Sequence, residues 1–416
     1  MALRGWPAGG LWRHPDFLRL WAAQAASAFG SRITRTALPI VAILTLGASP
    51  TEVAVLSALG VAPGVLVGLF AGGRVDRTAR RPLLVGADLV RALLLLTIPA
   101  AAWLGALSMP QLYAVAAATG AATTLFEIAD RSFLPSLVGP ERLVEANARL
   151  EATDSVAESV GPGIAGVLVQ ALSGPAAVAL DALTYLWSAL MLGRIRAREE
   201  PAAPPEEGFG LLADARAGLR ACMAHPLVRP LLLAESLMYL FGGFYLALYM
   251  VLALETLRLS PAAAGLVIGV GGVGAFAGAL LAAPLGRRLG TGPPLAVSLA
   301  VGQPANLLVP LAAQAVHLAI PLLVAQQLLG DAFLGAYLIH AVSLRQRVLP
   351  AAVLGRANAV FHVATGLLLP AGALLAGPLA DALGVPGALW IGACGGLLAA
   401  AVLLASPAAR GPRPAA

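Results

Sequence analysis

Lysine is absent from this 416-residue chain, because all 27 basic residues are arginine. This excludes lysine-based chemistry and the phosphate-binding motif GxxxxGK followed by Ser or Thr, so the chain contains no ATP-driven pump of that type. Cysteine is also scarce, and Cys222 and Cys394 have neither metal-ligand nor redox spacing. No nucleophile–base pair or metal-ligand cluster stands out, so we expect neither an enzyme, nor a cofactor, nor a metal site.

Charge is the second scarcity. Only 12% of the residues are charged, 59% are hydrophobic and the mean hydropathy is +0.84, whereas soluble domains carry roughly 25% charged residues. The net charge of +6 comes from arginines in short loops, without the basic stripe and interleaved aromatics typical of nucleic-acid binding. Apolar runs of about 20 residues recur along the chain, which predicts a polytopic protein of the lipid bilayer.

These runs predict an all-α integral membrane protein with twelve transmembrane helices. The first six spans are about 17–46, 53–73, 83–104, 111–131, 146–171 and 176–194. The second six are about 229–254, 262–285, 294–313, 318–342, 358–380 and 387–405. Between them, 195–228 begins as a Pro- and charge-rich linker and continues as an amphipathic helix expected at the membrane surface. We therefore predict two six-helix bundles, 1–194 and 229–416, joined by the linker 195–228.

The two halves repeat. At a constant offset of 211 residues, the segment 146–148 matches 357–359, Gly161 matches Gly372, and Pro175 matches Pro386. Two pseudo-symmetric repeats with a substrate path at their interface are typical of transporters.

Arginine placement predicts the orientation. Alternate loops hold nearly all loop arginines, and the loops of the opposite side hold essentially Arg258 alone. Because arginine-rich loops stay inside, we expect both termini to be cytoplasmic in a bacterial-type inner membrane. The opening segment lacks the apolar core of a cleavable signal, so we expect the first span to act as the insertion signal.

Two motifs carry a family resemblance. Residues 72–81 read GGRVDRTARR, and 161–166 read GPGIAG. The first resembles the loop 2–3 motif of the major facilitator superfamily, with Ala79 in place of a glycine, and the second is similar to its antiporter element. Further segments, such as Ala37-Leu38-Pro39 and Leu143-Val144-Glu145-Ala146-Asn147, resemble the drug- and siderophore-exporter branch that includes enterobactin exporters and macrolide efflux pumps. The resemblance implies alternating access by rocking of the two bundles.

The resemblance also implies roles for both motifs. The loop would form a latch that closes the outward-facing state by pairing with acids near the inner end of span four; alternatively, its arginines only hold the loop inside. The residues of this latch are Gly72, Asp76, Arg77, Arg80, Arg81, Glu127 and Asp130. Gly161, Pro162 and Gly166 would allow the close helix approach needed for gating, or simply tight packing against span eight.

Charged residues within the predicted spans are the clearest candidates for a functional site. Glu151, Asp154 and Glu158 follow Asn147 at spacings of four, three and four, so all lie on one helical face. Because acids facing lipid are costly, this face should meet a wet cavity or a partner helix. Either the acids relay protons or bind a cation, or they form structural pairs near the inner mouth. Arg35 in span one is the natural counter-charge.

The second half contributes two more candidates. Glu235 lies on a stripe of span seven with Tyr239, and Asp331 lies in the middle of span ten. A mid-membrane carboxylate is a candidate proton site, because desolvation favours its neutral form.

Together these features predict an exporter of hydrophobic or amphipathic small molecules, driven by proton antiport. Sodium coupling, a lipid or lysolipid flippase, and another solute transporter on the same fold stay open as alternatives. A transport-inactive sensor or scaffold fits less well, because a scaffold has no reason to keep charges in the membrane. The expected partners are a small-molecule substrate, protons or sodium, and the bilayer, with no nucleic acid and a monomeric state.

Overall fold

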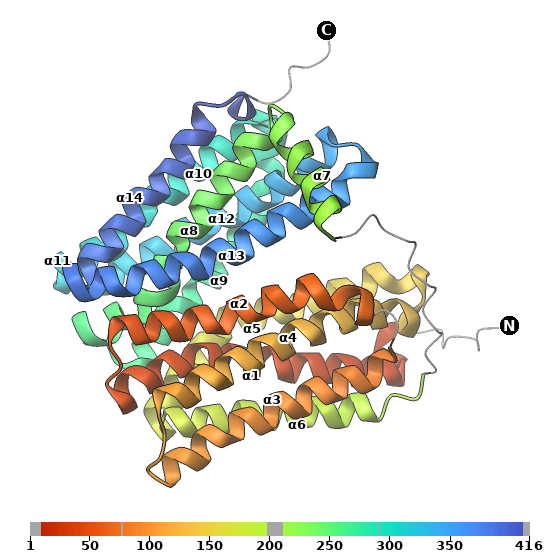
Figure 1. The fold of residues 1–416 in the computed structure, drawn as a ribbon, viewed down its shortest axis with the longest axis vertical. Helices are drawn as coiled ribbons and strands as arrows, with labels where there is room; N and C mark the ends of the chain where they lie inside the picture. The colour runs from red at the N-terminus through yellow and green to blue at the C-terminus, as the bar shows by residue number, and fades with distance from the viewer. Residues whose placement is uncertain (1–9, 76–77, 198–210, 291, 411–416) are drawn as a thin grey trace, which may run out of the picture. The chain divides into compact units, whose positions relative to one another are not determined.

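The computed structural model describes residues 10–75, 78–197, 211–290 and 292–410. Every regular element within these ranges is helical, and twelve of the described helical segments are long and apolar enough to cross a membrane (Figure 1). The predicted all-α fold with twelve spans is thereby confirmed. The chain divides into two compact units: unit 1 comprises Met1–Leu46 and Leu59–Glu206, and unit 2 comprises Gly47–Ala58 and Glu207–Ala416.

The first six spans are single helices. They are α1 (Pro15–Leu46), α2 (Pro50–Val75), α3 (Arg80–Trp103), α4 (Met109–Val138), α5 (Leu143–Leu172) and α6 (Gly174–Gly193). The remaining helices are α7 (Leu211–Ala224), α8 (Val228–Val251), α9 (Pro261–Leu289), α10 (Pro293–Ala305), α11 (Leu308–Gln314), α12 (Ala319–Val348), α13 (Ala351–Leu383) and α14 (Val385–Leu404). A π-helical turn, Leu252–Thr256, follows α8.

Local sequence explains where helices begin and end. Pro261 is the first residue of α9, and the hydroxyl of the preceding Ser260 accepts a hydrogen bond from the backbone N–H of Ala263 at 3.2 Å. Proline suits this position because its missing N–H would have had no partner in the first turn. Gly139 ends α4 with φ 76° and Gly290 ends α9 with φ 85°, a left-handed conformation that glycine adopts without strain.

The internal repeat is visible in the packing of each unit. In unit 1, α1 packs against α5 and α6, and α3 packs against α4 and α6. In unit 2, α8 packs against α13 and α14, and α10 packs against α12 and α14. The offset of 211 residues relates individual contacts as well. Gly161 packs against Arg32, and Gly372 packs against Gly243.

Span nine is interrupted. The helix α10 ends at Ala305 and α11 begins at Leu308, within a segment that the sequence predicts as one span. Pro310 accounts for the break, because it has no N–H to donate to the carbonyl of Asn306 and its ring would clash with that carbonyl. The carbonyl of Asn306 instead accepts hydrogen bonds from the backbone N–H of Val309 at 3.2 Å and from the hydroxyl of Tyr245 at 3.1 Å.

The amphipathic helix α7 packs against α13 and α8 within unit 2. Asp214 forms an ion pair with Arg356 at 2.9 Å, and Cys222 is fully buried in a cluster with Val228 and Leu231. Burial raises the pKa of the Cys222 thiol, so the cysteine is an inert packing residue at neutral pH.

Candidate functional site

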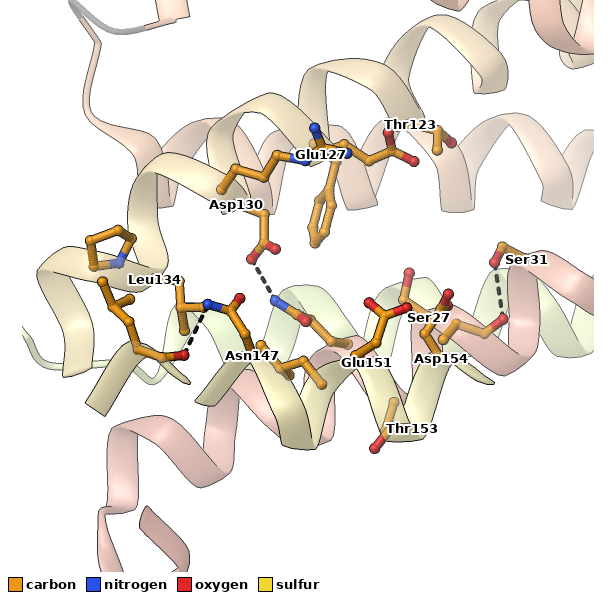
Figure 2. A pocket seen from close by; sticks show the side chains of 18 of the residues that line it. Ser27, Ser31, Thr123, Glu127, Asp130, Leu134, Asn147, Glu151, Thr153 and Asp154 are labelled. Carbon is orange, nitrogen blue, oxygen red and sulfur yellow. Dashed lines mark hydrogen bonds between the residues drawn. The ribbon is translucent and has the colours of Figure 1, made fainter. Parts of the chain in front are cut away.

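A polar cavity of about 430 Å³ lies inside unit 1, between α1, α3, α4 and α5. Figure 2 shows Glu127 and Asp130 on α4 across the cavity from Glu151 on α5. The amide of Gln24 on α1 donates a hydrogen bond to the carboxylate of Asp130. Asp154 lines the same cavity, so the acids that the sequence analysis assigned to two separate roles surround one space.

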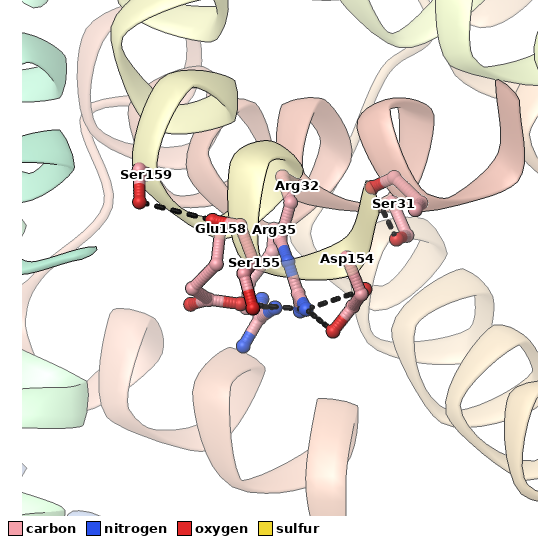
Figure 3. A network of polar contacts seen from close by, with 8 residues as sticks. Ser31, Arg32, Arg35, Asp154, Ser155, Glu158 and Ser159 are labelled. Atoms are coloured by element: carbon pink, nitrogen blue, oxygen red, sulfur yellow. Dashed lines mark hydrogen bonds and ion pairs between the residues drawn. The ribbon is translucent and has the colours of Figure 1, made fainter. Parts of the chain in front are cut away.

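An ion-pair cluster adjoins this cavity and joins α1 to α5 (Figure 3). The guanidinium of Arg32 lies 2.6 Å from Glu158 and 3.2 Å from each carboxylate oxygen of Asp154. Arg35 lies 3.5 Å from the same Glu158 oxygen. Two arginines and two acids therefore share one face, with the side chain of Glu158 48% exposed and that of Arg32 17% exposed.

The structure brings Arg35 and Glu158 together as the sequence suggested, but the closer partner is Arg32. Arg32 was not among the predicted site residues. It precedes Arg35 by three residues, so at 3.6 residues per turn its side chain points about 60° away from that of Arg35 around the helix axis. A usable signal was present: arginines three residues apart on span one match acids four residues apart on span five. Such pairs present neighbouring charges on one helix face.

The glycine motif of span five belongs to the same helix crossing. A β-carbon at Gly161 would lie 2.5 Å from the Cβ of Arg32 and 3.1 Å from its Cγ. Gly161, Pro162 and Gly166 are all buried, and α5 continues through Pro162. The structure describes a close approach of Gly161 to Arg32 of α1, which sets the position from which Arg32 reaches the two acids. Packing of this motif against span eight stays a prediction.

The residues of the expected latch are only partly described. Asp76 and Arg77 lie outside the described residues, and Gly72 lies in the last turns of α2. Arg81 donates hydrogen bonds to the backbone carbonyls of Leu192 and Gly193 at the end of α6. Pairing of this loop, including Arg80, with Glu127 or Asp130 stays a prediction.

Glu235 occupies a buried ion pair in unit 2. Its side chain is 5% exposed, and both of its oxygens lie 3.3 Å from the guanidinium of Arg345. The guanidinium carbon of Arg345 also lies 4.0 Å from the ring centroid of Phe361. An equally buried pair, Asp88 with Arg91, lies in unit 1. Glu235 and Arg345 join α8 to α12, whereas Asp88 and Arg91 are three residues apart on α3. Removing one partner of such a buried pair leaves an uncompensated charge, so we interpret both pairs as structural.

The last acid, Asp331, lines a second cavity of about 270 Å³ inside unit 2, between α8, α10, α12, α13 and α14. By the internal repeat, α8, α10, α12 and α13 correspond to the four helices around the first cavity. Neither cavity was apparent from sequence, because a cavity depends on which faces of separate helices meet. Within the described ranges, no group of three or more His, Cys, Asp or Glu side chains is placed to hold a metal ion.

Comparisons with known proteins agree with this architecture. The sequence model of a family described as transmembrane secretion effector matches residues 10–411. The chain is similar to the multidrug efflux pump Tap of Mycolicibacterium fortuitum, with 27% identity over 387 residues that cover 90% of this chain and 91% of Tap. It is also similar to macrolide efflux protein A of Streptococcus pyogenes, with 26% identity over 180 residues that cover 43% of this chain and 44% of that protein.

Solved structures show the same fold. A bacterial homologue of the iron transporter ferroportin in its inward-facing state superposes with a TM-score of 0.73 at 19% identity, covering 94% of this chain and 98% of that one. At this identity the likeness concerns the fold alone.

Proposed function

The chain belongs to the transmembrane secretion effector family of major facilitator transporters, and on this premise we propose that it exports hydrophobic or amphipathic small molecules in exchange for protons. Transport would proceed by alternating access. The multidrug and macrolide efflux activities in its relatives' names support the substrate class. The arginine-rich loops support a bacterial-type inner membrane with both termini in the cytoplasm.

The observation that carries the proposal is the sharing of Arg32 between two acids. Arg32 contacts Glu158 at 2.6 Å and both oxygens of Asp154 at 3.2 Å, while Arg35 contacts Glu158 at 3.5 Å. The side chains of Glu158 and Asp154 are each about half exposed, so neither carboxylate is sealed inside the helix bundle. Arg32 can pair with either acid and Glu158 with either arginine, a choice of partners that an isolated ion pair does not have.

This arrangement lowers the cost of protonating Glu158. When Glu158 takes up a proton, it releases Arg32, but the guanidinium keeps its two contacts with Asp154 and is not left without a partner. The cluster then changes from two positive and two negative charges to a net charge of +1. Such a change in charge on one face of a bundle biases an equilibrium between two conformations only if the two solvate that charge differently. Glu158 is therefore the proposed coupling residue, with Arg32 and Arg35 setting its proton affinity.

The remaining predicted residues have supporting roles in this proposal. Glu151 and Asp154 line the polar cavity of unit 1. In this proposal they give protons a polar route to the ion-pair cluster of Arg32, Arg35 and Glu158. The loop that contains Asp76, Arg77 and Arg81 would close the outward-facing state.

Substrate-driven proton movement in proteoliposomes with an internal pH dye tests the proposal, with a macrolide as the probe. We expect Glu158→Gln to reduce proton flux by about tenfold or more, equivalent to about 1.4 kcal/mol. Exchange of labelled for unlabelled macrolide, which needs no net proton transfer, should continue in this variant. Glu145→Gln is the matched control, because Glu145 lies on the same helix and also pairs with an arginine, Arg149.

Two outcomes would count against the proposal. Unchanged proton flux in Glu158→Gln would remove Glu158 from the coupling step. Macrolide movement that is independent of pH in the wild-type protein would replace proton antiport with another form of transport.

A further inference from the structure

The helix α7 lies at one end of unit 2, at the level where a membrane span begins. Figure 1 shows it crossing the end of α13, against which it packs. Only residues 225–227 separate α7 from α8, the first helix of span seven. A connection this short keeps the end of α7 close to the point at which that span enters the bilayer. The helix is therefore within reach of the lipid headgroups.

One face of α7 is used up inside unit 2. A β-carbon at Gly218 would lie 2.5 Å from the backbone oxygen of Arg356, so α7 and α13 cross closely at this glycine. Asp214, one turn earlier, forms its ion pair with Arg356 at 2.9 Å, and Cys222, one turn later, is fully buried. Spacings of four place all three residues on the same face of the helix. This packed face also holds the one acid of α7.

The opposite face is exposed and consists of apolar and basic side chains. Over residues 213–224 the exposed residues are alanines together with Arg216, Leu219, Arg220 and Met223. Leu219 is 48% and Met223 is 42% exposed. The four larger side chains follow one another at spacings of three, one and three, which places them on one helix face. A face turned to water is normally polar throughout, so these two apolar side chains need another environment.

The charge of this face has one sign. Among the described residues, Arg216 and Arg220 have no acidic partner, because Asp214 lies on the packed face and pairs with Arg356. Topology alone would account for arginines near the inner membrane surface, but not for exposed Leu219 and Met223 between them. Alternation of apolar and basic side chains is typical of helices that lie in the membrane interface. There the apolar side chains enter the acyl region and the basic ones reach the headgroups.

We propose that the face formed by Arg216, Leu219, Arg220 and Met223 binds anionic phospholipids of the leaflet on the arginine-rich side of the protein. The guanidinium groups would bind headgroup phosphates, whose geometry they match, and the negative surface charge would add to the attraction. Free phosphate would leave Leu219 and Met223 in water. The helix α7 thereby anchors unit 2 with a strength that depends on lipid composition. This binding goes beyond the proposed export function and does not depend on it.

Quenching of a fluorophore on α7 tests the proposal in the full-length protein. Met223→Cys carries a bimane label in a Cys394→Ser background, because Cys394 is exposed whereas Cys222 is buried. The Cys394→Ser protein without Met223→Cys measures any labelling of Cys222. The protein is reconstituted in phosphatidylcholine vesicles that contain a small share of nitroxide-labelled phosphatidylglycerol or nitroxide-labelled phosphatidylcholine. We expect the association constant of phosphatidylglycerol at this site to exceed that of phosphatidylcholine about tenfold or more, equivalent to about 1.4 kcal/mol.

Variants of the arginines then separate this face from general inner-surface charge. Arg216→Gln combined with Arg220→Gln should reduce the preference to within about twofold, equivalent to about 0.4 kcal/mol, and the two lysine substitutions should keep most of it. The matched control combines Arg287→Gln with Arg288→Gln, which removes the same charge from the exposed last turn of α9. Leu219→Ser should reduce quenching by both lipids alike. Thermal unfolding confirms that each variant is folded.

Three outcomes would overturn the proposal. Equal quenching by the two lipids in the labelled protein would remove the preference for anionic headgroups. Weak quenching by both would place the face outside the bilayer, where it would meet water or a protein partner. An equal loss of preference in the α7 and α9 arginine variants would assign the effect to the overall charge of the inner surface. None of these results depends on transport, so the proposed export function is tested separately.

Discussion

Replacing Gly161 with alanine tests whether the crossing of α1 and α5 positions the ion-pair cluster. The new β-carbon would lie 2.5 Å from the Cβ of Arg32 and 3.1 Å from its Cγ, whereas carbon atoms pack best at about 3.5–4.0 Å. The two helices must therefore separate by roughly 1 Å, or the stem of Arg32 must move. Overpacking of this kind costs about 1–3 kcal/mol.

The same displacement acts on the proposed chemistry. A shift of roughly 1 Å would take Arg32 out of hydrogen-bonding distance of Glu158, which now lies 2.6 Å away. We therefore expect Gly161→Ala to lower the thermal unfolding midpoint by several degrees and to reduce macrolide-driven proton flux in proteoliposomes. Gly86→Ala is the control, because Gly86 is inside α3 and a β-carbon there would meet nothing within 4 Å.

A double variant tests whether the cost of Gly161→Ala comes from its overlap with the side chain of Arg32. In Arg32→Gly, the nearest remaining atom is the Cα of Arg32, 3.9 Å from the β-carbon position of Gly161. Adding Gly161→Ala to this background should cost less than about 0.5 kcal/mol, because the overlap is gone. If Gly161→Ala is no more destabilising than Gly86→Ala, or equally destabilising with and without the Arg32 side chain, the packing argument is wrong.

Two further predictions concern stability. Arg345→Ala would leave the buried carboxylate of Glu235 without its counter-charge and should cost about 3–5 kcal/mol, measured by thermal unfolding in detergent. Arg356→Ala, whose partner Asp214 is 35% exposed, should cost no more than about 1 kcal/mol, and equal losses would refute the distinction. The imidazole of His14 caps α1 by accepting a hydrogen bond from the N–H of Phe17 at 3.0 Å, and burial lowers the pKa of His14 below its usual 6.5 although Asp16 opposes this. Its stabilising contribution is therefore present above about pH 6.5 and lost as the pH falls through the lowered folded-state pKa. His14→Asn keeps a capping side chain that does not titrate, so its unfolding midpoint should fall less between pH 7.5 and 5 than that of the wild type, and parallel profiles would exclude this role.

Hydropathy alone was sufficient to predict the twelve membrane-spanning helices. A helix needs about 20 predominantly apolar residues to cross the hydrocarbon core. Each of the twelve spans can therefore be recognised from one continuous stretch of sequence. The repeat offset of 211 residues was equally accessible, and the structure relates the contact between Gly161 and Arg32 to that between Gly372 and Gly243 by the same offset. The break in span nine has a sequence signal in Pro310. The hydrogen bond from the hydroxyl of Tyr245 to the carbonyl of Asn306 at this break becomes apparent only in the structure.

Charge partners were harder to predict, because they depend on how each helix is rotated about its axis. Periodicity placed Asp154 and Glu158 on one face of span five, but it did not distinguish Arg32 from Arg35 as the closer partner. That choice follows from the packing of Gly161 on the stem of Arg32, a contact between helices more than 100 residues apart. Likewise, Glu235 and Asp331 are both acids within predicted spans, but only the packing of the helices shows that Glu235 pairs with Arg345 and that Asp331 lines a cavity. The bilayer constrains the composition of each span independently of the others, whereas rotation and burial arise only when the spans pack together.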